Sequence, residues 1–405
     1  VLPMDEVFGN DTDPENDVLS VGFFTQPDEG TITMNDVGEL VYTSPPDFFG
    51  ETIFSYRASD GEYESVPATI SLEVHMPGTI VWQGGSSENF SDPANWVGGV
   101  APGADDPVWI TPDGGGTVVV DTDTEVAAIW AGDADSPVLL KVNGRKLSAV
   151  GGMKVQPGSS FELSGNGTLD TTEDAIIAGE LLWKNGSMTG EGATVITKEG
   201  SALLDHNVTY LRGGRDLVNE GTLTQTSGSA LISDTAGATS VITNAAGGQW
   251  TVNLDNHRTM AFPDNAAATL NFVNEGTLTK KGANTNTLGY VNGVFTLTGS
   301  GVMEVEEGAL RIETDETSEL SGPVTLADGA TLGFYRGTAT ISGSVEMGSG
   351  SVLSTDNYAD LTFTSGAEIT GDGRLYLDSG GVTSVSYTHL TLPTNRVAGG
   401  GGGWG

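Results

Sequence analysis

The feature that most constrains this chain is a loose internal repeat over residues 117–383, in which short β-prone segments alternate with glycine-rich polar corners. The clearest pair is 218–224 and 273–279, which share the sequence Val-Asn-Glu-Gly-Thr-Leu-Thr at an offset of 55 residues. Short strands punctuated by Gly and Asn are typical of a parallel β-helix, because each coil turns sharply and often through positive φ. We therefore predict an all-β chain with a right-handed parallel β-helix (β-solenoid) over 117–383, at roughly 20–25 residues per coil and on the order of a dozen coils.

The charge balance restricts the partners of such a chain. Against 16 basic residues stand 54 acidic ones, so the formal net charge is −38. A surface of this kind repels nucleic acid and anionic lipid and attracts cations, above all calcium. Disorder would also explain such a charge, but 37% hydrophobic residues in regular runs favour a folded chain. No apolar run is long enough to insert into a membrane, and the absence of cysteine excludes thiolate metal sites and cysteine nucleophiles.

The two ends of the sequence carry no repeat. Val1 opens directly on domain-like sequence without a signal peptide, so we expect an internal piece of a longer protein. Residues 384–405 continue no coil and include the glycine run 399–403, which is typical of vector-derived sequence. We predict a non-native or disordered tail there, with a natural glycine-rich linker as the alternative.

Residues 1–75 form a different unit. Alternation of apolar and polar residues is clear in 38–43, 51–58 and 68–74, and turn signals such as Asp60-Gly61 separate these runs. Short alternating strands at this spacing predict a β-sandwich.

The first unit resembles the bacterial cadherin-like tandem repeat. The resemblance rests on Phe-Gly-Asn-Asp-Thr-Asp-Pro-Glu-Asn-Asp-Val-Leu at 8–19, Tyr-Thr-Ser-Pro at 42–45, Asp-Phe-Phe-Gly at 47–50 and Phe-Ser-Tyr at 54–56. It implies an immunoglobulin-like (cadherin-like) sandwich in a bacterial surface adhesin or other large secreted protein, with calcium near the domain junctions. Extracellular or cell-surface localisation follows from the same resemblance.

An acidic loop in this unit is the predicted metal site. Acidic oxygens at every second position of a tight loop, here Asp11, Asp13, Glu15 and Asp17, can converge on Ca²⁺, which accepts six to eight oxygen ligands. The resemblance implies that this loop is the calcium site and places Asp60 in the matching later position. The predicted calcium ligands are Asn10, Asp11, Asp13, Glu15, Asp17 and Asp60. The alternative is a solvated acidic turn with Asx caps.

The sequence departs from the commonest form of the repeat at one point of this loop. Glu15-Asn16 stands where Asp-Gly is usual. Asn is the non-glycine residue that best tolerates a left-handed conformation, so the turn is expected to survive.

Residues 76–116 are rich in aromatic side chains and form a third segment. Its Trp-, Asn-Trp- and Asp-Asp-Pro-Val-containing sequence is similar to the lead-in that precedes β-helices in bacterial exported proteins. We predict a junction that caps the open end of the solenoid with large flat side chains. The repeats of 117–383 resemble those of bacterial surface β-helices of the autotransporter-passenger type, which indicates architecture more than activity.

Two carbohydrate-directed functions compete with a structural one. A polysaccharide lyase or glycoside hydrolase needs acids and a base from adjacent coils, and one cluster supplies them: Asp205, His206, Arg212, Arg215 and Asp216. The sequence contains no zinc-protease, serine-hydrolase or Walker motif. A carbohydrate-binding module would use exposed aromatic side chains, for which the candidates are Trp130, Trp183, Trp250, Tyr290, Tyr335 and Tyr376. The competing interpretation is that most of these fill the coil interior.

The sequence as a whole favours a non-enzymatic role in adhesion or display, with Ca²⁺ stiffening the sandwich. The expected partners are cell-surface or matrix glycans or proteins and the neighbouring domains of the parent chain.

Overall fold

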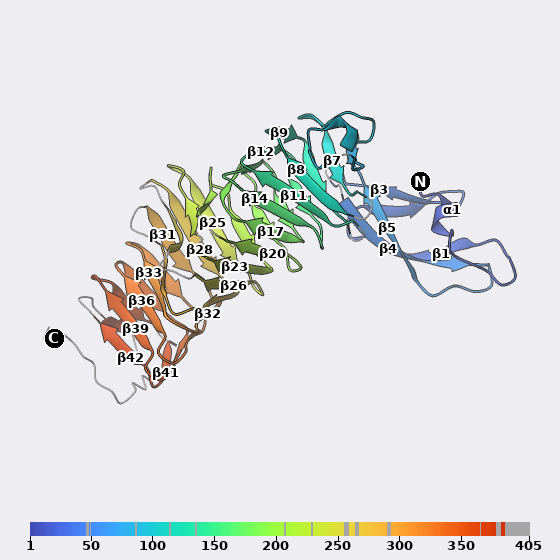
Figure 1. The fold of residues 1–405 in the computed structure, drawn as a ribbon. Helices are drawn as coiled ribbons and strands as arrows, with labels where there is room; N and C mark the ends of the chain where they lie inside the picture. Colours follow the sequence, from blue (N-terminus) through green and yellow to red (C-terminus); the bar gives the residue numbers. More distant parts are fainter. Residues whose placement is uncertain are drawn as a thin grey trace. The chain divides into compact units, whose positions relative to one another are not determined.

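The computed structural model divides the chain into two compact units, Val1–Thr79 and Ile80–Gly405 (Figure 1). It describes residues 1–45, 48, 50–85, 87–112, 115–133, 136–205, 208–227, 230–254, 259–263, 267–289, 293–364, 366–377 and 382–384. Helix in this described part is limited to α1 (Met4–Val7) and the 3₁₀ turn η1 (Pro93–Asn95). The predicted all-β class is confirmed. None of the described helical segments has the length and apolar character needed to span a bilayer.

The first unit is a small antiparallel sandwich. One layer has the strand order β1-β4-β5, and β2 pairs with β3 in the other. The strands are β1 (Ser20–Phe24), β2 (Thr31–Met34), β3 (Leu40–Thr43), β4 (Gly50–Ser59) and β5 (Ala68–Val74). Alternation in β4 turns Phe54, Tyr56 and Ala58 into the core, where they meet Ile32 and Leu40 from the other layer. The alternation of apolar and polar residues thus gives the two layers apolar faces that pack against each other.

The second unit is a parallel β-solenoid in which every third strand returns to the same sheet (Figure 1). Sheet I comprises β6 (Ile80–Trp82), β7 (Pro107–Ile110), β10 (Ala128–Ala131), β13 (Met153–Val155), β16 (Ala175–Ile177), β19 (Thr194–Ile196), β22 (Leu217–Asn219), β25 (Thr239–Asn244), β28 (Thr269–Asn274) and β31 (Val294–Thr298). Sheet II comprises β8 (Gly116–Val120), β11 (Val138–Asn143), β14 (Ser160–Ser164), β17 (Glu180–Trp183), β20 (Ser201–Leu204), β23 (Thr222–Thr226), β26 (Gln249–Asn253), β29 (Thr277–Lys280), β32 (Val302–Val305), β35 (Val324–Leu326), β38 (Ser344–Met347) and β41 (Glu368–Gly371).

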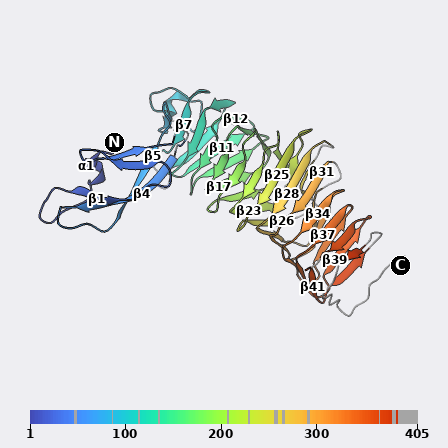
Figure 2. The same ribbon diagram turned by 180° about the vertical axis from the view of Figure 1, so that it is seen from behind.

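Two further sheets complete the coils. Sheet III comprises β9 (Thr124–Val126), β12 (Lys146–Ala149), β15 (Thr168–Thr171), β18 (Gly186–Thr189), β21 (Val208–Leu211), β24 (Ala230–Ser233), β27 (Thr259–Pro263), β30 (Thr285–Leu288), β33 (Ala309–Glu313), β36 (Thr331–Tyr335), β39 (Val352–Asp356) and β42 (Arg374–Leu377). Sheet IV comprises β34 (Thr317–Leu320), β37 (Thr338–Ile341), β40 (Asp360–Phe363) and β43 (Val382–Ser384). The view from behind shows β34 and β37 following β25, β28 and β31 along the solenoid (Figure 2).

Register fixes the length of each coil. Partner residues on sheet II are separated by as few as 20 residues, as in Ser160 and Glu180, and by as many as 28, as in Gln249 and Thr277. The predicted length therefore holds for most coils, and the longest coils exceed it. The repeated segments 218–224 and 273–279 lie two coils apart, since β22, β25 and β28 are successive neighbours in sheet I.

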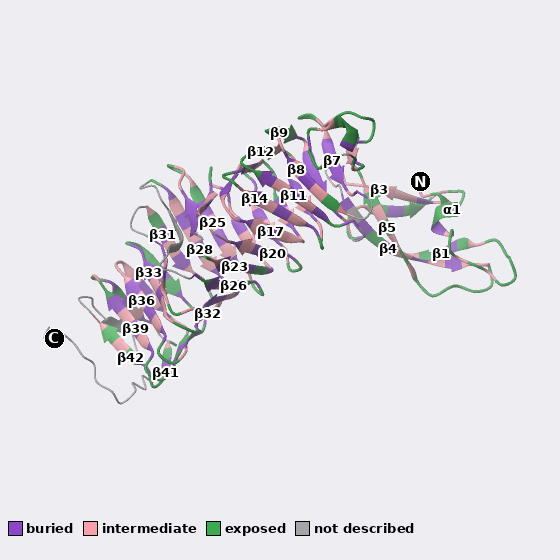
Figure 3. Cartoon of the chain, viewed as in Figure 1, coloured by how far each residue is buried: buried purple, intermediate pink, exposed green. Residues whose placement is uncertain are grey.

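The solenoid core is a stack of inward-facing apolar side chains. In β14, Phe161 and Leu163 have 0% exposure, while the alternate residues Ser160, Glu162 and Ser164 face outward and are partly exposed. Figure 3 shows the same alternation of buried and intermediate residues along successive strands. Each fully buried Leu or Phe contributes about 1.5–3 kcal/mol, so every coil adds its own share to the stability of the stack.

Glycine is required where coils approach each other closely at the corners. Gly190 has φ 99°, and a Cβ there would lie 2.0 Å from the carbonyl oxygen of Thr171 in the preceding coil. Gly186 has φ 121°, and a Cβ would lie 2.4 Å from the carbonyl oxygen of Gly167. Both conformations and both contacts exclude other residues, which explains why glycine punctuates the repeat.

An aromatic cluster lies at the first strand of sheet I. Trp82 of β6 meets Trp96 edge to face, with ring centroids 5.0 Å apart, and Phe90 meets Trp96 at 4.8 Å. The Trp96 Nε1–H donates to the carbonyl oxygen of Phe90 at 2.8 Å. All three side chains belong to the hydrophobic core of the solenoid, so residues 80–116 are continuous with the coils that follow.

The predicted tail falls almost wholly beyond what the structure describes. Ser384 ends β43, and residues 385–405 lie outside the described residues.

Candidate functional site

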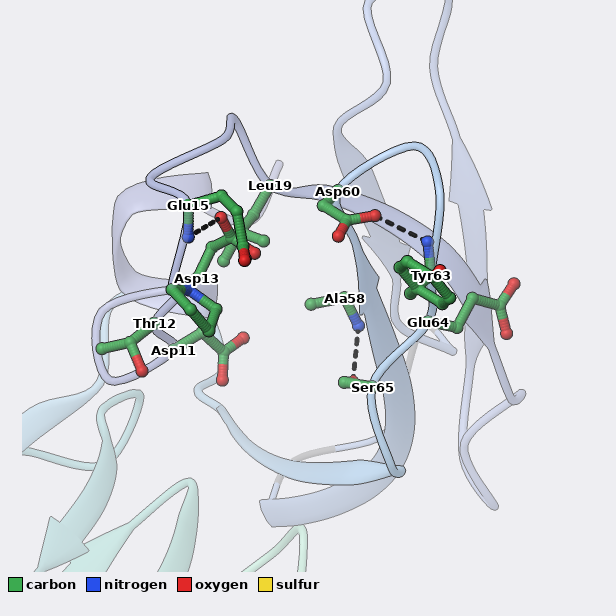
Figure 4. A pocket seen from close by; sticks show the side chains of 11 residues that line it. Asp11, Thr12, Asp13, Glu15, Leu19, Ala58, Asp60, Tyr63, Glu64 and Ser65 are labelled. Carbon is green, nitrogen blue, oxygen red and sulfur yellow. Dashed lines mark hydrogen bonds between the residues drawn. The ribbon is translucent and has the colours of Figure 1, made fainter.

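The predicted metal loop borders a hollow of about 320 Å³ in the first unit, which we call the acidic pocket (Figure 4). One wall is the loop that follows α1, and the other is the turn after β4. The lining residues are Asp11, Thr12, Asp13, Pro14, Glu15, Leu19, Ala58, Asp60, Tyr63, Glu64 and Ser65.

The pocket gathers four of the six predicted ligands. Asp11, Asp13 and Glu15 line one wall and Asp60 lines the other, whereas Asn10 and Asp17 are not part of the lining. Glu64, which was not among the predicted ligands, also borders the pocket, although Figure 4 shows its carboxylate pointing away from the hollow. An acid four residues after Asp60 in the same turn was the available signal.

Two of the carboxylates act as turn caps. The Asp13 Oδ1 accepts the backbone N–H groups of Glu15 at 3.0 Å and Asp17 at 2.8 Å. Asn16 lies between them with φ 61°, which confirms the expectation that Asn adopts the left-handed conformation here. The Asp60 Oδ1 accepts the N–H groups of Tyr63 and Glu62, each at 2.7 Å, and these bonds lower the pKa of Asp60.

Asp11 is tied to the core of the sandwich through Tyr56. The Tyr56 hydroxyl lies 2.6 Å from the Asp11 Oδ2 and 2.8 Å from the carbonyl oxygen of Val7. Burial first, and then the hydrogen bond and charge of Asp11, raise the pKa of Tyr56 to about 12. The phenol therefore stays protonated and anchors one wall of the acidic pocket to β4.

The carboxylates of the acidic pocket suit a hard cation, but they lie too far apart to enclose one. None of the 11 lining residues is basic, so the carboxylates are not neutralised within the pocket. Carboxylate oxygens are the ligands that Ca²⁺ prefers. No three acidic or histidine side chains among the described residues lie close enough together to hold a metal ion. The pocket thus concentrates negative charge without forming a closed cage.

In the solenoid, the described residues of the cluster considered for a lyase or hydrolase make separate structural contacts. Arg212 binds Asp234 through Nε and Nη2, the shortest contact being 2.9 Å, and its guanidinium stacks 4.5 Å from the Tyr210 ring centroid. Asp205 accepts the Thr226 hydroxyl at 2.9 Å. Asp216 accepts the backbone N–H of Val241 at 2.6 Å. His206 lies outside the described residues.

Arg215 is a buried structural cation with 0% exposure. Its guanidinium donates to the hydroxyls of Thr194 and Thr171, each at 2.9 Å, and to the carbonyl oxygens of Ala193 at 2.8 Å and Thr189 at 3.2 Å. Burial lowers its pKa to about 10, against the attraction of nearby acids, so the group remains charged at neutral pH. One side chain thus joins the corners of three successive coils.

The aromatic residues considered as candidates for sugar binding divide by burial. Trp183 has 0% and Trp250 has 1% exposure, and both lie in the solenoid core. Trp130 is also buried, with its ring stacked on that of Trp109 at 4.6 Å. Tyr376 is 48% exposed and Tyr335 is partly exposed. Tyr290 lies outside the described residues.

Sequence reasoning missed a buried asparagine ladder. The Asn219 Nδ2–H donates to the Asn244 Oδ1, and the Asn244 Nδ2–H donates to the Asn274 Oδ1, both at 2.8 Å. Lys280 is also fully buried, and its Nζ donates to the carbonyl oxygens of Lys281, at 2.7 Å, and Gly282, at 2.6 Å. The signal for the ladder was the Asn that recurs before Glu-Gly in the repeat.

An antiparallel sandwich joined to a parallel solenoid defines a modular, all-β repeat protein. The family model described as a bacterial Ig domain matches residues 2–73, so the first unit is an Ig-like domain. No curated protein was found to match the chain. The cadherin-like type of the domain and the passenger type of the solenoid stay predictions.

Proposed function

We propose that this protein is a non-enzymatic scaffold with an adhesin-like role outside a bacterial cell. A bacterial Ig-like domain together with a β-helix indicates a surface or secreted repeat protein. The observation that carries the proposal is that side chains fill the solenoid interior along its length. Its core is continuous from Trp82 to Ile369, and even its buried polar groups, such as Arg215, are occupied in joining coils.

The location is tested by protease treatment of intact cells that produce the full-length protein. We expect loss of the protein from intact cells while a cytosolic marker is preserved. Protection until the cells are lysed would overturn the proposed location.

The proposal of a non-enzymatic role rests on the structural contacts that already occupy charged side chains of the cluster considered for a lyase or hydrolase. Arg212, Arg215 and Asp216 each hold a structural partner. A screen against uronate-containing polysaccharides measures the unsaturated product that a lyase releases and the reducing ends that a hydrolase releases. We expect neither product. Turnover that survives repurification of the protein would overturn this part of the proposal.

We also propose that calcium stabilises the Ig-like domain at the acidic pocket by drawing its two walls together. Support comes from four of the predicted ligands, Asp11, Asp13, Glu15 and Asp60, around one hollow whose lining contains no basic residue. Because the cage is not closed, we expect weak binding of the kind seen in extracellular modules, with Kd on the order of 10⁻⁴–10⁻³ M.

The calcium proposal is tested by melting the protein with millimolar Ca²⁺ or with chelator. We expect Ca²⁺ to raise the melting temperature of the first unit, and Asp13→Asn with Asp60→Asn to abolish the increase, because the amide keeps a cap acceptor but loses the charge. Asp36→Asn, an exposed acid in the turn between β2 and β3, is the matched control. Equal melting in Ca²⁺ and chelator would favour plain Asx-capped turns.

A further inference from the structure

Two neighbouring hollows lie where β36 and β39 end, at one corner of the solenoid. The larger, of about 410 Å³, is lined by Asp315, Arg336, Gly337, Asn357 and Tyr358. The smaller, of about 130 Å³, lies on sheet III and its lining includes Arg311, Tyr335, Ser354 and Asp356. The two hollows are lined by consecutive residues at the same strand ends. Tyr335 and Asp356 line the smaller hollow, and Arg336 and Asn357 line the larger one. We call them together the β36–β39 corner.

Tyr358 is unusual in this corner for both its exposure and its backbone conformation. It is 75% exposed, so packing in the core does not account for it. Its φ is 69° and that of Asn357 is 50°, whereas the matching corner of the preceding coil places Gly337 at φ 59°. A large aromatic residue is disfavoured in this conformation, in which glycine is at ease. An exposed aromatic side chain held at a place suited to glycine calls for a role at the surface.

Charged and planar groups line the two hollows of this corner. The Arg336 Nη1 lies 3.7 Å from the Asp315 Oδ1, and the Arg311 Nη2 lies 3.1 Å from the Glu313 Oε2. The Arg311 guanidinium also stacks 3.4 Å from the Tyr335 ring centroid. The Nε atoms of Arg311 and Arg336 are buried and have no hydrogen-bond partner among the described residues.

The charges of the corner select the ligand class. Arg311 and Arg336 are balanced by Glu313, Asp315 and Asp356, so the corner carries no excess of positive charge. The chain as a whole has a net charge of −38, which repels polyanions. A flat exposed ring beside paired acids, guanidinium groups and an amide fits the apolar face and the hydroxyl groups of an uncharged sugar.

We propose that the β36–β39 corner binds neutral oligosaccharides. The Tyr358 ring stacks on one sugar, whose hydroxyl groups bond to Asp315, Arg336 and Asn357, and the smaller hollow beside Tyr335 takes the adjoining sugar. This inference deepens the proposed adhesin-like function, because it names a ligand class and a site for it.

The test uses the full chain on a printed array of neutral, uronate-containing and sulfated oligosaccharides, followed by titration calorimetry with the strongest neutral probe. We expect binding to neutral probes only. Tyr358→Ala should weaken it about tenfold or more, while Tyr358→Phe keeps the ring and most of the affinity. Phe23→Ala, which removes a ring that is 52% exposed in the other unit, is the matched control and should leave the affinity unchanged.

Tyr358→Gly separates recognition from folding. Glycine relaxes the positive φ, so this variant should melt no lower than the parent and still lose binding. The inference is overturned if no neutral probe binds, if acidic glycans bind better, or if Tyr358→Ala binds as well as the parent. A protein that lies outside the cell but binds no sugar refutes the inference alone. Turnover of a bound sugar leaves the site standing and refutes the non-enzymatic role.

Discussion

The asparagine ladder gives the sharpest prediction about what holds the coils together. Asn244 has 0% exposure and lies in β25 between Asn219 of β22 and Asn274 of β28. It accepts one hydrogen bond, from Asn219 at 2.8 Å. It donates two, to the Asn274 Oδ1 at 2.8 Å and to the carbonyl oxygen of Thr277 at 3.1 Å. Asn244→Ala removes all three bonds.

The size of the effect follows from the three lost bonds. Each buried hydrogen bond contributes about 1 kcal/mol net, and a partner left unsatisfied adds to the cost. We therefore expect Asn244→Ala to lower the free energy of unfolding of the surrounding coils by roughly 3–4 kcal/mol. Thr243→Ala, at the adjoining outward-facing position, is the matched control and should change it by less than about 0.5 kcal/mol.

Native-state hydrogen exchange read by mass spectrometry is the assay, because it reports the opening free energy coil by coil. In a stack whose coils contact only their neighbours, the loss should centre on β22, β25 and β28 and fade within a coil or two. Equal exchange in Asn244→Ala and Thr243→Ala would refute the structural role of the ladder.

Three further predictions concern buried groups. Arg215→Ala strands carbonyl oxygens at the two preceding corners and should cost about 3–5 kcal/mol in urea unfolding. Arg212→Ala removes a partly exposed ion pair and should cost less than about 1 kcal/mol, so similar losses would contradict the buried role of Arg215. Trp96→Ala should lower the unfolding free energy of the first coils by about 3–5 kcal/mol in denaturant melts, and a loss below about 1 kcal/mol would exclude an aromatic cap. Burial raises the pKa of Glu313, so the folded state binds the carboxyl proton more tightly than the unfolded state does. The free energy of unfolding should therefore fall as pH rises above the ordinary pKa of glutamate. Glu313→Gln should flatten that part of the pH profile, and an unchanged slope would contradict this role of Glu313.

Much of the fold follows from local patterning. Glycine at the corners and alternation along the strands predicted the solenoid, because both are properties of neighbouring residues in the chain. The same alternation places Trp183 in phase with Leu181, which explains its burial in β17. The sandwich followed from alternation in β4 and from the resemblance of its loops.

What the sequence did not predict depends on contacts between coils. Arg215 looked like surface chemistry because arginine is usually exposed, and only the stacked corners bring carbonyl oxygens around it. The asparagine ladder escaped for the same reason, since its amide hydrogen bonds join residues 25 and 30 positions apart in the sequence. The acidic pocket was anticipated through Asp11, Asp13 and Asp60, but the Asx caps that engage two of them arise from loop geometry that spacing alone does not fix.

The most direct test of the stacked solenoid is a set of spin-label distances on one outward-facing column of sheet II. The chain has no cysteine, so labels can be placed at will. Lys141 and Thr224 are four strand steps apart, and Thr224 and Thr325 are a further four apart. Coils spaced as in a β-sheet predict about 19 Å for each of these pairs and about 38 Å between Lys141 and Thr325. Distances that fail to add up in this way, or that grow with the number of intervening residues, would contradict the stack.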